Sequence, residues 1–591
     1  MAKRLSNGKQ TLPWGVALGL TLLQAIIWWF VTPPWTAPDE PGHYLYARLI
    51  AERGVIPDAV APEQWHEVLV SMEQTGWRAY LHPNGDLVPD IAQEPVLAAS
   101  GTQVGRKPPG YYALAALWLR ALPDWPRLSP TVQMRWIRLL SPVFRLLTTA
   151  TALHLATRLW PNEPGRILGL GLLVGLMPMV GFIGGSLNND ALTLLWGGVA
   201  FSALLLARSF REWTLALGLI IMGPLLVDVN LLYLWPLALW RWGFFRHEAG
   251  CLQVRTRASW RPALLVMGAL ALALMLSLFP NSHRAAGWRS RNTQQTRREG
   301  QLFLQAHTRP AVISQAISGK EILQRRGQTM TLEARISGHG EGLMLQMTDG
   351  RDEVETICPL ASEPRLCYLT FPLTPESRHL TVSARLPAGA ASLQLQLTDP
   401  AGWSLLSNGD GRLPASIGQA LFIGMERHLP LPSGYFDRIL SPAVWDAPSL
   451  LRYGIFAGFT WASFWGYFGW LSRPFPWPTY LLLVAVTLAA LVGVARRLSH
   501  ILREPTASEA GALIFSLGAL ALVLLQTWLP MLGQAWQPQG RYLFPALLPI
   551  AILLLLGWET ALPRRFRHRL PWLLTLSLLL LNLQAWRLTL P

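Results

Sequence analysis

Charged residues are scarce in this sequence. Only 14% of its 591 residues are Asp, Glu, Lys or Arg, against about a quarter in a typical soluble domain. Hydrophobic residues make up 51%, and apolar runs of about 20 residues, the length that crosses a bilayer, recur along the chain. The composition argues against a soluble enzyme and predicts a polytopic membrane protein.

Acidic residues are scarcer than basic ones. The chain has 34 Asp and Glu against 50 Lys and Arg, so its net charge is +16. Much of the basic excess lies in short loops between apolar segments, where positive charge fixes the orientation of a membrane protein. No basic patch with interleaved aromatic residues stands apart, and we expect no nucleic-acid partner.

Cysteine is also rare, with three residues. Cys251 stands alone in a basic loop. Cys358 and Cys367 are close enough in the sequence for a disulfide, but the sequence alone leaves that pairing open. The apolar run near the N-terminus is too long for a signal peptide and is not followed by a small-residue cleavage site, so we expect a retained first span.

The fold class we predict is an all-α polytopic membrane bundle with an inserted β-sandwich. Its eleven predicted spans are 11–31, 137–156, 165–183, 191–207, 213–228, 230–242, 262–279, 480–495, 510–529, 542–558 and 570–588. Two further apolar segments, 108–122 and 451–471, are interpreted as helices at the outer interface; if both cross the bilayer, the number of spans rises from eleven to thirteen.

Alternate loops are basic, so we expect them, and the N-terminus, to face the cytoplasm. Three parts follow from this topology: an N-terminal module (1–280) with a long outer loop (32–136), an extracytoplasmic insert (281–445) and a C-terminal part (446–591). The basic loops contain Arg158, Arg166, Arg208, Arg211, Arg241, Arg496, Arg497 and the arginines of "RRFRHR" (564–569).

Short alternating runs within 327–400, such as "MTLEARI" and "HLTVSARL", predict half-buried antiparallel strands. A small β-sandwich on the outer face is the expected product. It resembles the jelly-roll modules that bind sugars, and a purely structural lid fits equally well.

Several polar residues that are far apart in the sequence fall on one membrane face in this topology. Each lies at or beside the end of a span, so a bundle could bring them around one cavity. Each also has a simpler explanation: Asp39 and Asp190 could cap helices, Arg541 could anchor at the interface, Lys107 could be a solvated loop charge and His43 could only pack. The set is Asp39, Glu40, His43, Lys107, Asn188, Asn189, Asp190, Arg541 and Tyr542.

The order of the motifs resembles that of the GT-C membrane glycosyltransferases, which include the protein O-mannosyltransferases and the lipid A aminoarabinose transferases. The motifs are "PDEPGH" after the first span, then "KPPGYYAL", "RLLSPVFRLLT" and "SLNNDAL". Two more, "FWGYFGW" and "QPQGRYLFPALLPI", look closest to an uncharacterised bacterial group of that clan. The resemblance covers roughly 11–210 and 450–557, and the β-rich insert lies outside it.

The resemblance implies transfer of a sugar from a polyprenyl-phosphate donor to a glycan, lipid or protein acceptor at the outer face. The family's carboxylate at the end of the first span, a base or metal site, matches Asp39, with Glu40 beside it. Its second acidic residue matches Asp190. The family often has a Lys where the fifth span ends, whereas this chain has Asp228 in "GPLLVDVN", so the cation that holds the donor phosphate is left open.

Glycosyl transfer needs a base for the acceptor hydroxyl and cations for the departing phosphate. We therefore expect Asp39 to be the base, or with Glu40 a metal ligand, and Asp190 to orient the acceptor or the metal. We expect Arg541 and Lys107 to bind phosphate, with support from His43 and Tyr542. The acidic residues could also hold a divalent cation such as Mg²⁺ or Mn²⁺.

Two other functions fit parts of the sequence. A lipid or glycan flippase would place charges at mid-membrane and carry inverted repeats, and neither is visible here. A non-catalytic cell-envelope assembly protein would use the β-rich insert as its working part, with the acidic residues as helix caps.

Overall fold

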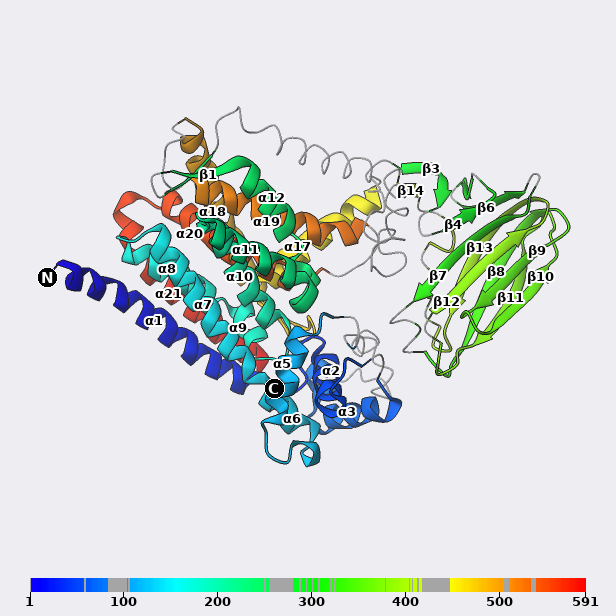
Figure 1. Ribbon diagram of the computed structural model, residues 1–591, viewed down its shortest axis with the longest axis horizontal. Helices are drawn as coiled ribbons and strands as arrows, with labels where there is room; N and C mark the ends of the chain where they lie inside the picture. The colour runs from blue at the N-terminus through cyan, green and yellow to red at the C-terminus, as the bar shows by residue number, and fades with distance from the viewer. Residues whose placement is uncertain are drawn as a thin grey trace. The chain divides into compact units, whose positions relative to one another are not determined.

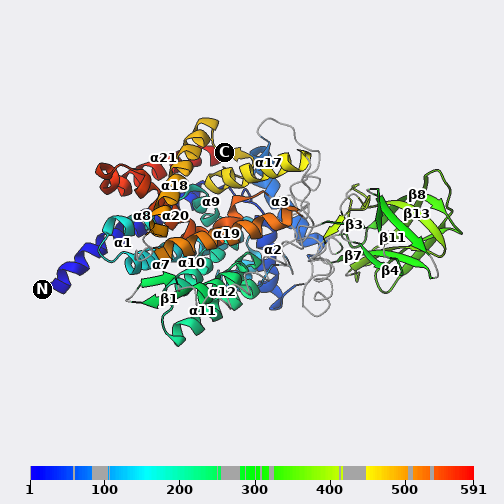
Figure 2. The same cartoon turned by 90° about the horizontal axis from the view of Figure 1, so that it is seen from above.

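The computed structural model forms two compact units, one helical and one built of β-strands (Figures 1 and 2). The helical unit comprises Met1–Val266, Gly454–Thr527 and Pro538–Pro591, and the β unit Met267–Tyr453 and Trp528–Gln537. The structure describes residues 2–57, 60–82, 104, 107–248, 251–254, 280–285, 288–293, 295–299, 301–306, 309–318, 322, 325–377, 379–402, 404–406, 408–411, 414–416, 447–503, 510–532 and 538–590.

Six helices or helix pairs in the described residues are long and apolar enough to cross a membrane. The expected membrane character therefore has a structural counterpart, but eleven spans are not shown. The six are Thr11–Val31 in α1 (Ala2–Val31), Pro130–Leu159 in α6 (Pro130–Arg138) and α7 (Leu140–Leu159), Phe210–Val227 in α11 (Phe210–Met222) and η4 (Gly223–Val227), Trp477–Ile501 in α18 (Trp477–Arg503), Ala510–Trp528 in α19 (Ala510–Leu532) and Gly540–Ala561 in η7 (Gly540–Ala546) and α20 (Leu547–Ala561).

A seventh candidate is broken. Helices α8 (Pro164–Leu176) and α9 (Pro178–Gly184) meet at an angle of 54°, because Pro178 cannot donate a hydrogen bond to the preceding turn. Three other helices supply donors to the carbonyls left open at the break. Gln24 and Asn582 donate to the carbonyl of Leu176, and Arg145 donates to that of Gly175. A guanidinium at the C-terminal end of a helix also interacts favourably with the negative end of the helix dipole.

The other predicted spans fare differently. Predicted span 191–207 corresponds to α10 (Asp190–Leu206), which is apolar but has 17 residues. The prediction for 230–242 is displaced, because the helix there, α12 (Leu234–Phe244), begins and ends later in the chain; it has only 11 residues. Helix α21 (Leu570–Thr589) forms where 570–588 was expected but is not among the six. Segment 262–279 lies outside the described residues.

The two segments expected at the outer interface are both partly helical. Segment 108–122 contains α5 (Gly110–Arg120), and 451–471 overlaps α17 (Ala447–Trp465). The remaining helical segments are α2 (Glu40–Arg53), α3 (Pro62–Gln74), α4 (Trp77–Leu81), η3 (Trp125–Arg127), η5 (Val229–Leu231) and η8 (Arg564–Arg569), with the short strand pairs β1 (Phe245–Glu248) with β2 (Cys251–Val254) and β15 (Tyr467–Phe468) with β16 (Arg473–Pro474).

The β unit contains two five-stranded antiparallel sheets, in the orders β10-β9-β12-β7-β4 and β11-β8-β13-β6-β5. Alternate residues of both sheets, such as Leu345 and Leu395, are buried in one hydrophobic core. The predicted β-sandwich is thus present, but it begins earlier in the chain than 327, since β4 to β7 also belong to it. The strands are β4 (Arg289–Arg291), β5 (Arg297–Arg298), β6 (Gln301–Ala306), β7 (Ala311–Ser318), β8 (Thr329–His339), β9 (Leu343–Thr348), β10 (Glu353–Cys358), β11 (Arg365–Pro372), β12 (His379–Leu386) and β13 (Gly389–Thr398), with the outlying pair β3 (Pro280–Ala285) and β14 (Pro414–Ser416).

Cys358 and Cys367 form a disulfide, with their Cα atoms 6.1 Å apart. Cys358 ends β10 in one sheet and Cys367 lies in β11 of the other. The bond therefore joins the two sheets at one edge of the sandwich. It settles the pairing that the sequence left open.

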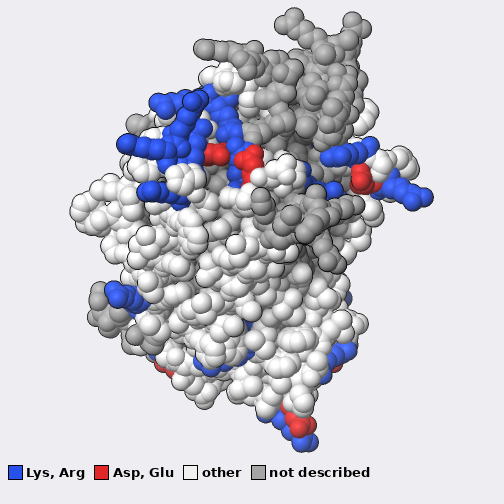
Figure 3. Space-filling model, turned by 90° about the vertical axis from the view of Figure 1, so that its left-hand side faces the viewer, with Lys and Arg blue, Asp and Glu red and all other residues white. Residues whose placement is uncertain are grey.

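The helical unit has two chemically different ends. At one end, Arg166 at the start of α8 and Arg497 of α18 both bind Glu559 near the end of α20, and the arginines of η8 follow. Figure 3 shows Lys and Arg gathered toward one end of a face of the molecule, beside a wide uncharged surface. At the other end, α1 leads into α2 and α10 begins, and the predicted site residues lie there.

Candidate functional site

Asp39 occupies a strained turn between α1 and α2. Its φ of 64° lies in the left-handed region, which non-glycine residues adopt at an energetic cost. Asp39 is the N-cap residue of α2, but its side chain makes no capping hydrogen bond. Capping therefore does not explain this carboxylate.

Arg541 lies between the two carboxylates that the sequence singled out. Its Nη2 atom is 2.6 Å from Oδ2 of Asp39, and its Nη1 atom is 3.7 Å from Oδ2 of Asp190. The guanidinium is buried, with 7% of the Arg541 side chain exposed. The three residues come from the α1–α2 turn, the start of α10 and η7, so this cluster forms only in the folded chain.

A second ion pair lies in the same network. Lys107 Nζ is 3.1 Å from Oδ2 of Asp228, and Asn189 donates to the same oxygen. The other Asp228 oxygen accepts from the backbone N–H of Asn230 at 2.8 Å. Asp228, which stands where the GT-C enzymes that the sequence resembles often have a Lys, is the counter-charge of Lys107 in the structure.

Two glycines permit these pairings. A Cβ atom on Gly197 of α10 would collide with the carbonyl oxygen of Pro545 in η7, and one on Gly110 of α5 would collide with that of Leu226 in η4. The first contact brings η7 close to α10, where Arg541 reaches Asp190. The second brings the segment after Lys107 close to η4, which ends just before Asp228.

Glu40 is engaged elsewhere. Its two carboxylate oxygens accept from Arg138 Nε at 2.7 Å and Nη2 at 2.8 Å, and one also accepts from the backbone N–H of Leu187 at 2.9 Å. Arg138 additionally donates to the carbonyls of Thr32 and Pro33. This buried pair ties the turn after α1 to α6 and to the segment before α10, so the adjacent acids of "PDEPGH" have different surroundings.

His43 lies one turn into α2, and its Nδ1 atom is 2.7 Å from the hydroxyl of Tyr112. Tyr112 also stacks on Tyr46, with ring centroids 4.1 Å apart. Burial lowers the pKa of His43 to about 3, against the opposing effect of Asp39. The imidazole is therefore neutral at physiological pH.

The ion pairs also fix the charge states of Asp39 and Lys107. Burial would raise the pKa of Asp39, but Arg541 and the other nearby cations outweigh it and hold the pKa below its usual value. Burial would lower the pKa of Lys107, but Asp228 and Asp190 raise it above its usual value. Both groups are charged at neutral pH.

Three buried polar atoms of the cluster have no hydrogen-bond partner among the residues that the structure describes: Asn188 Nδ2, Asp190 Oδ2 and Arg541 Nε. Asn188 uses its other side-chain atom to accept from the backbone N–H of Asp190 at 2.9 Å. Since buried polar groups in proteins are nearly always bonded, two donors and one acceptor here are open to a ligand or to water.

The described residues contain no group of three or more His, Cys, Asp and Glu that could hold a metal ion. Asp39 and Asp190, two of the three acids expected to do so, both face Arg541. Glu40, the third, is bound by Arg138. In this structure, the positive charge between Asp39 and Asp190 is the guanidinium of Arg541.

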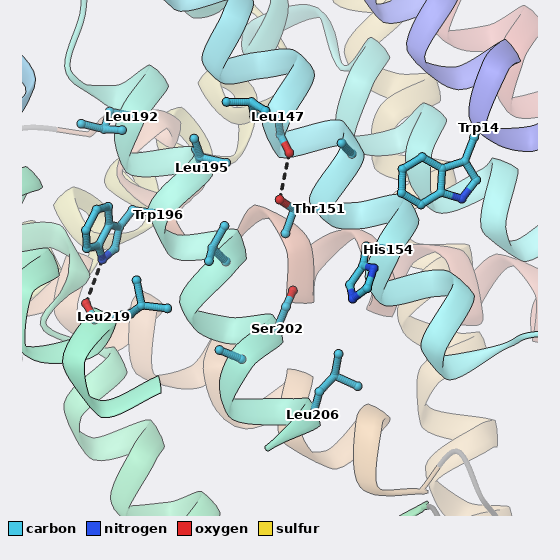
Figure 4. A pocket seen from close by; sticks show the side chains of 13 residues that line it. Trp14, Leu147, Thr151, His154, Leu192, Leu195, Trp196, Ser202, Leu206 and Leu219 are labelled. Carbon is cyan, nitrogen blue, oxygen red and sulfur yellow. Dashed lines mark hydrogen bonds between the residues drawn. The ribbon is translucent and has the colours of Figure 1, made fainter. Parts of the chain in front are cut away.

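An apolar groove of about 740 Å³ runs along the helical unit (Figure 4). Its walls come from α1, α7, α10 and α11. The α10 residues that line it, from Leu192 to Leu206, lie on the opposite side of that helix from Asp190 and Gly197, by the 3.6-residue repeat. The groove is therefore distinct from the charged cluster.

The structure thus brings together Asp39, Asp190, Arg541, Lys107 and Asn189. His43 and Tyr542 border the same cluster: the backbone N–H of His43 donates to the carbonyl of Asp39 at 3.0 Å, and the Arg541 guanidinium lies 5.7 Å from the Tyr542 ring. Asp228, Arg138 and Tyr112 were not among the residues predicted for the site. Asp228 had a signal, its place at the end of an apolar run, but only the fold pairs it with Lys107.

Comparisons with family models and with curated proteins give no match. Among solved structures, the chain is similar to TmCBM61 in complex with beta-1,4-galactotriose, at 12% identity over 20% of this chain and 91% of that chain, with a TM-score of 0.15. A likeness at that score supports no conclusion about this protein.

Proposed function

We propose that this protein is a membrane glycosyltransferase of the GT-C type, which moves a sugar from a polyprenyl-phosphate donor to an acceptor at the extracytoplasmic face. The observation that carries the proposal is the guanidinium of Arg541 between Asp39 and Asp190. Carboxylates for proton transfer and cations for a phosphate are what this reaction needs at one point.

The proposed reaction begins when the donor phosphate enters the cluster. Arg541 shifts its hydrogen bonds from Asp39 to the phosphate, to which Lys107 also binds. Asp39, no longer paired, takes the proton from the acceptor hydroxyl. The acceptor oxygen bonds to C1 of the sugar, the bond from C1 to the phosphate oxygen breaks, and its electron pair leaves with the polyprenyl phosphate.

The charges of the cluster set a condition on this exchange. Asp39, Asp190 and Asp228 carry three negative charges, and Lys107 and Arg541 carry two positive ones, so the cluster without a ligand has one negative charge in excess. A phosphate therefore has to compete with carboxylates for both cations. Asp190, whose Oδ2 atom accepts no hydrogen bond, is placed to orient the acceptor hydroxyl.

Two features support the extracytoplasmic side. The disulfide of the β unit belongs in an oxidising compartment, and the arginine-rich loops are typical of the cytoplasmic side. The polar cluster lies at helix ends, which fits an enzyme at the membrane interface better than a flippase, for which charges within the spans are expected.

Asp39→Asn tests the proposal. Transfer of radiolabelled sugar from a polyprenyl-phosphate donor should fall by about 10²–10⁴-fold, the usual contribution of a general base. Elution as a folded monodisperse species should not change. Asp124→Asn, an exposed aspartate that also has a positive φ, is the matched control and should keep full activity. Equal transfer by both variants would contradict the proposal.

A further inference from the structure

We infer that the apolar groove is a binding site for an anionic phospholipid of the leaflet at the basic end of the helical unit. Its acyl chain would lie along α10, and its headgroup would lie at His154 and Arg158. This site is separate from the charged cluster and does not depend on the proposed function.

The groove walls identify the kind of occupant. α1, α7 and α11 belong to candidate membrane spans, and α10 is an apolar helix beside them. A hollow with such walls faces the hydrocarbon of the bilayer, where a lipid chain is the molecule at hand. Of the lining residues, only Thr151, His154, Ser202 and the indoles of Trp14 and Trp196 carry polar side-chain atoms.

Most of those polar atoms are already bonded within the protein. The hydroxyls of Thr151 and Ser202 donate to carbonyls of their own helices, and the indoles of Trp14 and Trp196 donate to Thr157 and to the carbonyl of Leu219. The groove surface is therefore effectively apolar except at His154, which Figure 4 shows near Ser202 and Leu206.

The groove has the length of a lipid chain. Its α10 wall runs from Leu192 to Leu206, which is about 21 Å at 1.5 Å per residue. That exceeds half of a hydrocarbon core about 30 Å thick. A chain that enters at the Leu206 end can thus lie in the groove over the full depth of its own leaflet.

Among the described residues beside the groove, exposed positive charge lies at the end where α7 ends. His154 lines the groove near the end of α7, and Arg158, four residues on, continues the same face of that helix. Both side chains are exposed. Ser209 and Phe210 begin the next helix beside Arg208 and Arg211, so this end is basic. At the opposite end, the groove begins with Leu192 and Leu147, which carry no charge. An anionic headgroup therefore fits at one end and not at the other.

Lipid binding by the full-length protein tests the inference. After transfer into nanodiscs of phosphatidylcholine with or without phosphatidylglycerol, native mass spectrometry should detect retained phosphatidylglycerol in preference to phosphatidylcholine. Arg158→Gln should weaken this preference roughly fivefold, the effect of about one basic residue near an anionic surface. Arg564→Gln, which removes an exposed arginine of η8 at the same end, should leave it unchanged.

A second pair of variants tests the groove itself. Val199→Phe places an aromatic ring on the α10 wall and should abolish selective retention, whereas Val484→Phe, on the exposed side of α18, should not. Inorganic phosphate should not displace the bound lipid, because it has no chain for the groove. Equal retention of both lipids by the unmodified protein, equal loss in both arginine variants, or retention in Val199→Phe would each overturn the inference.

Discussion

Asp39 and Arg541 are separated by 502 positions in the sequence and form an ion pair of 2.6 Å. Arg541 also reaches Asp190, so one guanidinium joins the end of the first span, the start of α10 and the segment before α20. A residue with a single donor group cannot make both contacts in this way.

Arg541→Lys should therefore lower kcat for sugar transfer by about 10²-fold or more, since each oxyanion donor contributes about 10²–10³-fold. The charge is kept, but the fork that spans two carboxylates is lost. A double-mutant cycle with Asp39→Asn measures their coupling. Additive effects of the two changes would show that the residues act independently.

Glu40→Gln should destabilise the protein and leave the chemistry intact. Without the carboxylate, the buried guanidinium of Arg138 loses its counter-charge, which costs about 3–5 kcal/mol. The melting temperature in detergent should fall while transfer per folded molecule stays normal. Glu73→Gln, which removes the exposed partner of Arg78, should cost less than about 1 kcal/mol. The opposite ranking would refute the structural role of Glu40.

Lys107→Met should raise KM for the donor by about 10–150-fold, because hydrogen bonds to charged groups contribute about 1.5–3 kcal/mol. It also leaves Asp228 buried without its cation. The exchange Lys107→Asp with Asp228→Lys restores a pair of opposite charges, so its stability should exceed that of either single variant. An unchanged donor KM in Lys107→Met would exclude this lysine from phosphate binding.

His43 should make stability depend on pH in mildly acidic solution. Its pKa is lowered to about 3 in the folded protein, whereas an unfolded histidine titrates near 6.5. As the pH falls below about 6.5, the unfolded chain takes up the proton first, so the free energy of unfolding decreases by about 1.4 kcal/mol per pH unit. Above pH 6.5, histidine is neutral in both the folded and the unfolded chain, so His43 causes no loss of stability there. His43→Asn should show a flatter profile of melting temperature between about pH 6 and 4.5; parallel profiles would contradict the prediction.

Reduction of the disulfide should loosen the β unit. The bond closes a loop with a sequence separation of 9, and the loss of such a constraint costs about 2–3 kcal/mol by the chain-entropy relation. Cys358→Ala with Cys367→Ala should lower the melting temperature of the β unit, while Cys251→Ala should not. Protection of β10 amides in hydrogen exchange reports the difference.

The parts of this fold that could be predicted from the sequence are those that depend on residues close together in the chain. Alternation within β8, β12 and β13 is local, and those strands were predicted correctly. Strands β4 and β5 were missed because they have only three and two residues. Strands β6 and β7 were missed because their apolar and polar residues do not alternate regularly. Membrane character follows from composition, but the number of spans does not, because α12 is cut short and α8 is broken at Pro178.

The site shows the same division. The motif "PDEPGH" marks Asp39 and Glu40 equally, and no local pattern tells that one faces Arg541 while the other is held by Arg138. That difference depends on α6 and η7, which lie about 100 and 500 residues away. Asp228 likewise looks like a departure from a pattern until Lys107 is seen beside it.

The left-handed backbone at position 39 narrows the set of side chains that can occupy it. Glycine adopts that conformation freely, and asparagine and aspartate adopt it more readily than other residues; of these three, only aspartate has a carboxylate that can accept a proton. Mutational drift to either of the other two would preserve the turn while removing the base. The amino acids tolerated at position 39 would therefore distinguish selection for the fold alone from selection for catalysis.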